Sequence, residues 1–179
     1  MKFLKSVLIA CVIDATLPII GKTNNNTRDT GVVINGVRWA TRNVGAPGTF
    51  VDNLWDAGQL FTWKEAQNAC PKGWRLPTAT ELWLLEFRSR GGSDWTAMNG
   101  VNGRIFGDSP RQVFLPAAGF FGDRRIGVGV LGFYWSSTLI DTDFSLTLHL
   151  NDLVSNVVMG IRYDIRYSVR CVAISPPNF

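Results

Sequence analysis

Short hydrophobic stretches separated by turn-forming residues predict a chain built from small elements. Residues 32–34 and 37–39 are mostly apolar and flank Asn35-Gly36, a pair that tolerates the positive φ of a two-residue hairpin turn. We therefore expect a β-hairpin over residues 32–39. A polar segment rich in Asn and Thr precedes it at residues 22–30 and is typical of a linker.

Two short helices are predicted from their start signals. Residues 62–65 (TWKE) and 78–81 (TATE) match the capping box, in which a Thr hydroxyl and a Glu carboxylate bind unpaired N–H groups of the first turn. Apolar residues at helical spacing follow each box, and the glycines at 91–92 are expected to end the second helix.

The chain after residue 90 is predicted to be all-β with long loops. Strands are expected within residues 113–115, 126–138 and 146–150, and a terminal strand is expected over residues 167–174. Together with the two helices, this pattern predicts the α+β class, with two short helices packed on small antiparallel sheets and long loops.

Composition indicates one folded domain. Of the 179 residues, 46% are hydrophobic, and seven Trp and eleven Phe supply enough apolar side chains for one well-packed core. We place the domain at residues 31–175 and treat residues 1–30 as an N-terminal apolar segment and a polar linker.

The first twenty residues admit two interpretations. Lys2 and Lys5 followed by an apolar run are typical of a secretion signal, and residues 8–11 (LIAC) match the end of a lipoprotein signal. The run before Cys11 is short and Asp14 follows it, which favours an uncleaved strand or assembly segment. A membrane span needs about 20 uninterrupted apolar residues, so no transmembrane span is expected.

The charge distribution argues against a nucleic-acid partner. The net charge is +4, but Lys and Arg are scattered, and Arg124-Arg125 is the one adjacent basic pair. Acidic residues concentrate at residues 139–165, where four Asp stand against one Arg and the net charge is −3.

Residues 139–165 (LIDTDFSLTLHLNDLVSNVVMGIRYDI) are the strongest candidate for a binding segment. Residues 146–150 alternate like a framework strand, whereas residues 139–144 and 157–165 place large apolar residues within turn-like, acidic sequence. Exposed apolar patches with polar rims mark interaction sites. The candidate ligand-binding residues are Leu139, Ile140, Asp141, Asp143, Phe144, Leu146, His149, Asn151, Asp152, Val157, Met159, Ile161, Tyr163, Asp164 and Ile165.

Four of these residues are the expected anchors. Ile140, Phe144, Met159 and Tyr163 carry aromatic or long apolar side chains, which dominate interface energetics. The Asp residues are expected to orient and attract basic partners.

No catalytic motif is found in the sequence. His149 is the single histidine and lies within a strand pattern, and neither Cys-x-x-Cys nor Gly-x-Ser-x-Gly occurs. The glycines at residues 100–103 do not join a strand to a helix, so they do not predict a phosphate loop. We therefore expect a protein that is not an enzyme and that uses no cofactor or metal.

Three landmarks in order resemble a known family. Residues 69–78 (ACPKGWRLPT), 134–138 (YWSST) and 168–172 (SVRCV) are similar to C-type-lectin-like domains of the Fibrobacter succinogenes major paralogous family. The same landmarks occur in Bacteroides-type and phage variable proteins that are diversified by retroelements. The resemblance spans about residues 31–175 and implies a C-type-lectin-like fold.

The resemblance implies a disulfide between Cys70 of the first helix and Cys171 of the last strand. In this pairing Cys11, the third cysteine, has no partner. The alternative is that Cys70 and Cys171 are reduced and pack in the core as small apolar side chains. The family's sugar-binding lectins hold Ca²⁺ through Glu-Pro-Asn or Gln-Pro-Asp together with Trp-Asn-Asp. None of these tripeptides is present, so calcium-dependent sugar binding is not implied.

The resemblance also implies a function. In retroelement-diversified relatives the stretch between the second and third landmarks is rewritten, so residues 139–165 are expected to vary between sibling genes. The expectation is a ligand-binding module for a protein or glycan receptor on a target cell, displayed on a phage tail tip or bacterial surface.

Two alternatives remain. A structural subunit of a virion or surface assembly would use the same segment as an oligomer interface. A formylglycine-generating oxidase is the other, although such enzymes are much longer and their cysteine pair has no equivalent here.

Overall fold

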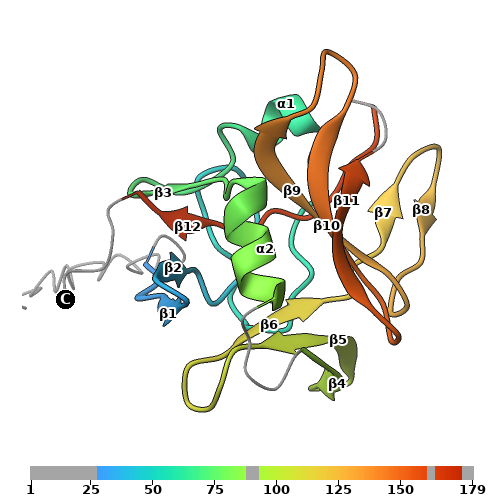
Figure 1. The fold of residues 1–179 in the computed structure, drawn as a ribbon. Helices are drawn as coiled ribbons and strands as arrows, with labels where there is room; N and C mark the ends of the chain where they lie inside the picture. Colours follow the sequence, from blue (N-terminus) through green and yellow to red (C-terminus); the bar gives the residue numbers. More distant parts are fainter. Residues whose placement is uncertain (1–27, 88–92, 161–163, 175–179) are drawn as a thin grey trace, which may run out of the picture.

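The computed structural model describes residues 28–87, 93–160 and 164–174, which form four small sheets and two helices (Figure 1). Strands make up 41% of the structure and helices 9%. The predicted α+β class is therefore wrong, and the fold is mostly β. The helices are short, and the hydrophobic pattern does not identify the strands at residues 94–106 and 155–160.

The N-terminal hairpin and the last strand share one sheet. Its order is β1-β2-β12-β3, with β1 (Val32–Ile34), β2 (Val37–Trp39), β3 (Trp74–Arg75) and β12 (Val172–Ala173). Asn35 and Gly36 have φ of 50° and 80°, so the predicted hairpin is confirmed.

The terminal strand predicted over residues 167–174 is wrong in its length. β12 contains two residues, and residues 166–168 instead form isolated bridges with Phe61, Phe121 and Tyr134. The chain passes between separate elements here, so no single neighbour pairs with it continuously.

Both capping boxes are confirmed. The Thr62 hydroxyl accepts the N–H of Glu65, whose carboxylate accepts the N–H of Thr62, and Thr78 and Glu81 repeat this exchange. The first helix, α1 (Trp63–Ala66), lasts a single turn. The second, α2 (Ala79–Phe87), ends before residues 91–92, which lie outside the described residues.

Three further sheets follow in the chain. The first has the order β4-β5-β6, with β4 (Asp94–Met98), β5 (Val101–Phe106) and β6 (Val113–Pro116). The second pairs β7 (Phe120–Phe121) with β8 (Arg125–Ile126). The third has the order β11-β10-β9, with β9 (Gly132–Leu139), β10 (Ser145–Leu150) and β11 (Ser155–Gly160), and it packs against α2.

The core has two clusters. One contains Leu82 and Leu85 of α2 together with Leu148 and Leu150 of β10. The other surrounds Trp135 and includes the Cys171 end of the disulfide. The bond from Cys70 to Cys171 has an S–S length of 2.05 Å and a Cα–Cα distance of 6.0 Å, so the implied disulfide is confirmed.

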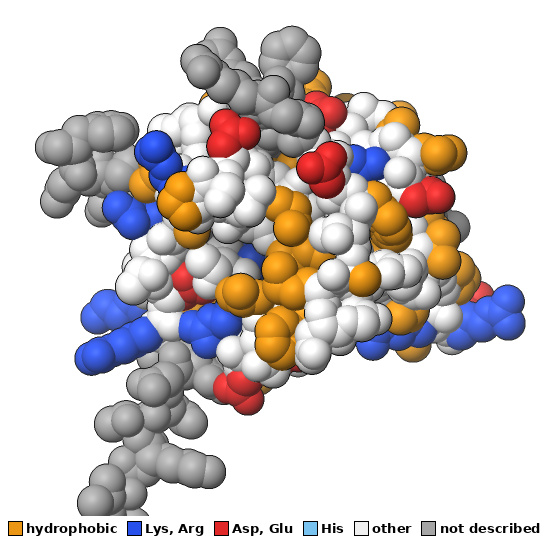
Figure 2. All heavy atoms as spheres, turned by 90° about the horizontal axis from the view of Figure 1, so that it is seen from below, with side chains coloured by type: hydrophobic (Ala, Val, Ile, Leu, Met, Phe, Trp, Pro, Cys, Tyr) orange, Lys and Arg blue, Asp and Glu red, His pale blue; other side chains and the backbone are white. Residues whose placement is uncertain are grey.

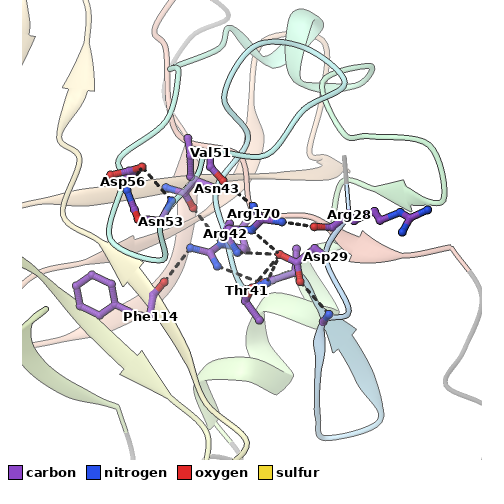
Figure 3. A network of polar contacts seen from close by, with 12 residues as sticks. Arg28, Asp29, Thr41, Arg42, Asn43, Val51, Asn53, Asp56, Phe114 and Arg170 are labelled. Carbon is purple, nitrogen blue, oxygen red and sulfur yellow. Dashed lines mark hydrogen bonds and ion pairs between the residues drawn. The ribbon is translucent and has the colours of Figure 1, made fainter. Parts of the chain in front are cut away.

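A buried arginine connects distant parts of the chain (Figure 3). Arg170 donates to the side-chain oxygen of Asn43 at 3.0 Å and to the carbonyls of Ala40 and Phe114 at 3.0 and 2.8 Å. Burial lowers its pKa to about 10, so it stays protonated at neutral pH. Burial also raises the pKa of Tyr134, which contacts Asn43, to about 12.

Asp29 ties the start of the domain to the loop after β2 (Figure 3). Its side chain is 1% exposed and accepts hydrogen bonds from the backbone N–H groups of Gly31, Thr41 and Arg42 and from the Thr41 hydroxyl, at 2.8–3.2 Å. Asp29 belongs to the polar segment predicted as a linker, yet its carboxylate is fully engaged in the fold.

Candidate binding surface

The β9–β10–β11 sheet carries most of the predicted binding segment, and one of its faces packs against α2 (Figure 1). The end of β9 is bound to the beginning of α2, because the Thr138 hydroxyl accepts the N–H of Ala79 at 2.9 Å. The Ser136 hydroxyl donates to the carbonyl of Leu146 at 2.5 Å. The second sequence landmark, residues 134–138, is therefore part of the frame that holds the sheet.

A register shift interrupts the pairing of β9 with β10. Thr147 pairs with Trp135, but Ser145 pairs with Leu139, so β9 has two more residues than β10 over this interval. Additional residues of this kind form a bulge, which bends a strand and increases its twist.

Four apolar side chains gather on one face at the end of this sheet. Leu148 and Leu150 are fully buried on the face that packs against α2, and alternation places Leu146 and Phe144 on that same face. Leu146 pairs with Met159, and the N–H of Ile140 donates to the carbonyl of Phe144 at 2.9 Å. We call Ile140, Phe144, Leu146 and Met159 the apolar patch.

The apolar patch is accessible to a partner. Ile140 is 48% exposed and Met159 is 56% exposed, whereas Phe144 and Leu146 are half-buried. Three of the four expected anchors therefore lie together. The fourth, Tyr163, lies outside the described residues, as does Ile161.

Asp141 shapes the loop that carries the patch. Its carboxylate accepts the N–H groups of Asp143 and Phe144 at 2.8 and 2.9 Å, which closes the turn between β9 and β10. Asp143 is exposed in this loop. The acidic sequence that suggested partner contact thus also serves to fold the loop.

The remaining acidic turn lies at the opposite end of the sheet. The Asn151 side-chain oxygen accepts the N–H groups of Leu153 and Val154 at 2.9 and 2.8 Å, which closes the turn between β10 and β11. Asp152 is exposed there. Leu146, the patch residue of β10 nearest to this turn, lies five residues before Asn151, which is roughly 17 Å along an extended strand. The predicted residues therefore do not form one compact site.

His149 lies on the other face of the sheet. Its ring stacks on Phe133 at 4.8 Å between centroids, and Phe133 stacks on Tyr167 at 4.8 Å. Partial burial lowers the pKa of His149. Leu139, which pairs with Ser145, also belongs to this face and is 46% exposed.

Three other predicted residues have separate environments. Val157 is half-buried and packs on the first core cluster, and Ile165 is half-buried and packs on the second. Asp164 is exposed. None of these three contributes an exposed apolar side chain to the patch.

Sequence reasoning missed Trp83 of α2, which is 52% exposed. Helical geometry places Trp83 on the flank opposite Glu81, and Glu81 pairs with Arg75 of β3 at 2.6 Å. Trp83 thus lies on the side of α2 away from β3. A large aromatic residue at a non-core position of the helix is the signal that could have found it.

A separate hollow of about 580 Å³ lies between the β4–β5 turn, the end of β6 and the turn after β8. Trp55, Val101, Ala118 and Val128 line it, with Arg125 among its charged residues. Figure 2 shows that hydrophobic side chains gather on the face seen from below. None of the predicted site residues lines this hollow.

The described residues contain neither a metal-binding cluster nor a helix that could cross a membrane. No group of three or more His, Cys, Asp or Glu there could hold a metal ion. Across residues 28–87, 93–160 and 164–174, no helix has the length and apolar character that crossing a membrane requires.

Comparisons with protein-family models, with characterised proteins and with solved structures found no match to this chain. Proposals about its function therefore depend on the geometry of the sheet and on the resemblance of the three landmarks.

Proposed function

We propose that the chain is a ligand-binding module that contacts a receptor on a target cell through the apolar patch. One observation carries the proposal, namely that Ile140 and Met159 are about half exposed although Met159 belongs to β11 and Ile140 directly follows β9 of the same well-packed sheet. Burying such side chains against a partner gains roughly 25 cal/mol per Å² of apolar area. Exposed apolar clusters with a polar rim are typical of interaction sites.

The frame beneath the patch suits a changeable surface. The Thr138 contact binds the sheet to the start of α2, the disulfide and the buried Arg170 hold other parts of the domain together, and none of these bonds uses a patch side chain. A substitution at Ile140 or Met159 would change the surface and leave this frame intact. This separation of the exposed side chains from the frame supports a variable protein of the retroelement-diversified type. Such a protein would be displayed on a phage tail tip or a bacterial surface, with a protein or glycan as receptor.

Binding to cells tests the proposal. The fluorescently labelled chain is incubated with a panel of bacterial strains and bound fluorescence is measured by flow cytometry. We expect at least one strain to bind the parent and to lose at least tenfold of that signal with Ile140→Asp or Met159→Asp. Val130→Asp is the matched control because Val130 is 57% exposed but lies outside the sheet. The proposal would be contradicted if Val130→Asp lost as much bound fluorescence as the patch variants. It would also be contradicted if neither patch variant lost any.

A structural subunit is the second candidate, and the exposure of further apolar residues at the opposite end of the sheet favours it. Leu153 is 81% exposed in the β10–β11 turn. Native mass measurements of the parent, Met159→Asp and Leu153→Asp separate the candidates. If the parent is an oligomer and the substitutions convert it to a monomer, the structural subunit is supported. If the mass is unchanged and cell binding is lost, the ligand-binding module is supported.

Sequencing the gene in sibling isolates tests diversification. We expect substitutions to concentrate within residues 139–165. Equal variation over residues 31–133 would rule out targeted rewriting.

A further inference from the structure

The outer edge of β11 presents backbone groups that can pair with another strand. The N–H of Trp135 donates to Ser168 and the carbonyl of Phe133 accepts from Ser168, so these β9 groups point away from β10. Trp135 pairs with Thr147 and Phe133 pairs with His149, so the backbone groups of Thr147 and His149 point towards β11.

The same alternation fixes the direction of the β11 groups. Thr147 pairs with Val158 and His149 pairs with Asn156, so Val158 and Asn156 use their backbone groups to bond β10. Ser155, Val157 and Met159 therefore turn their N–H and C=O groups to the outer edge. Among the described residues, no backbone hydrogen bond is made to these outward groups.

The edge also lacks the features that normally protect an edge strand. Natural proteins protect such edges with Lys, Pro, bulges or very short strands. β11 reads SNVVMG, contains no charged residue or Pro, and pairs with β10 over six consecutive residues without a register shift. Within residues 28–87, 93–160 and 164–174 this edge is unpaired and regular, and an edge of this length is suited to accept a strand.

The surroundings of the edge are acidic. At the Ser155 end, the charges of Glu86, Asp94 and Asp152 surround one buried Arg104. Towards the Gly160 end, the sequence carries Asp164, Asp141 and Asp143 against Arg162, so this end is net negative as well. A strand with basic residues on both sides of an apolar centre would complement this charge.

We propose that β11 binds an extended segment of a partner protein, with β-branched apolar residues at its centre and Lys or Arg on both flanks. Main-chain hydrogen bonds to Val157 and Met159 would hold the segment, and the apolar patch beside Met159 would contact its side chains. The inference rests on the proposed function and names the chemistry of its partner. A second copy of this chain fits less well, because antiparallel pairing of two β11 edges brings the acidic Ser155 end of one against the acidic Gly160 end of the other.

A synthetic peptide serves as the probe. Acetyl-Lys-Lys-Thr-Val-Thr-Val-Thr-Val-Lys-Lys-amide carries a fluorescent label, and its affinity for the full chain is measured by fluorescence anisotropy. Two control peptides replace every Lys by Glu or N-methylate alternate residues. We expect each control to bind at least tenfold more weakly than the Lys-flanked peptide, and we expect added salt to weaken the Lys-flanked peptide.

A pair of variants separates backbone pairing from side-chain contact. Met159→Pro removes an outward N–H without touching the bonds to β10, and Met159→Ala removes the side chain but keeps that N–H. We expect Met159→Pro to bind the peptide at least tenfold more weakly than Met159→Ala. The N-methylated peptide tests the same point on the parent protein, so the result does not depend on how well the Pro variant folds.

Measurements of peptide binding and mass can overturn the inference in three ways, and cell binding provides a fourth. The first is equal affinity of Met159→Pro and Met159→Ala together with equal binding of the N-methylated peptide. The second is no binding of the Lys-flanked peptide by the parent. The third is a dimer of the parent that Met159→Pro dissolves, which assigns the edge to a second copy. If Met159→Pro keeps cell binding and Ile140→Asp loses it, the proposed function stands and edge pairing is rejected. If the parent binds no cells, the proposed function itself is rejected.

Discussion

Replacing Asp29 by Ala is expected to destabilise the domain by about 3 kcal/mol. The substitution leaves the backbone N–H groups of Gly31, Thr41 and Arg42 and the Thr41 hydroxyl without their acceptor. An unsatisfied buried donor costs about 1–3 kcal/mol. The Thr41 hydroxyl can rotate towards water, and the three backbone donors belong to half-buried residues, so each of these three costs about 1 kcal/mol, near the lower end of that range.

The neighbouring arginine limits the loss. Arg42 approaches Asp29 at 3.5 Å but also donates to the carbonyl of Val51 at 2.9 Å and to that of Arg28. Arg42 therefore keeps two partners when the carboxylate is removed. Asp29→Asn should cost less, because one side-chain oxygen can still accept from Thr41 and Arg42.

Urea unfolding followed by Trp fluorescence measures the effect. With a slope of about 2 kcal/mol/M, a loss of 3 kcal/mol lowers the midpoint by about 1.5 M. Asp123→Ala is the control, because Asp123 is exposed and no hydrogen bond is assigned to it. A midpoint for Asp29→Ala within 0.2 M of the control, as an approximate limit of the measurement, would refute the assignment of Asp29 as a structural clamp.

Three further predictions concern the frame and its response to pH. The Cys70–Cys171 bond closes a loop with a sequence separation of 101 residues, so its reduction should lower the free energy of unfolding by about 4–5 kcal/mol, measured by urea titration with and without reductant. Leu148→Ala removes a fully buried side chain and should cost about 2–5 kcal/mol in the same assay, and a loss below 1 kcal/mol, as a rough threshold, would contradict its place in the core. Burial lowers the pKa of His149 in the folded state, so the unfolded chain binds the proton more tightly and stability should fall as pH drops through and below 6.5, the ordinary value. His149→Gln should flatten the slope of stability between pH 7.5 and 5.5, and an unchanged slope would show that other groups cause it.

Local signals in the sequence predicted local structure well. The Asn35-Gly36 turn and both Thr-x-x-Glu capping boxes depend on residues within four positions of one another, and all three formed as expected. The same turn signal at Asn99-Gly100 was not recognised, although these residues have φ of 49° and 79° and join β4 to β5. That hairpin, together with β11, moves the fold from the predicted α+β class to mostly β.

The pairing of strands decided which side chains meet. The sequence by itself identified residues 139–165 as unusual and named Ile140, Phe144 and Met159, but it did not show that Leu146 joins them or that His149 faces the opposite side. Strand alternation has a period of two, so the face of each residue depends on a register set by other strands.

The burial of particular charged side chains likewise became visible only in the tertiary structure. The motif containing Arg170 resembled a family landmark, but its contacts with Asn43, Ala40 and Phe114 join residues 56 to 130 positions apart. Asp29 was predicted to lie in a linker because its neighbours in the sequence are polar and show no hydrophobic periodicity. The sequence determined turns, caps and the amount of apolar material, because these depend on near neighbours and composition. The position of β11 at the edge of its sheet, the apolar patch and the buried polar network were decided by tertiary structure, because each depends on which distant segments become neighbours.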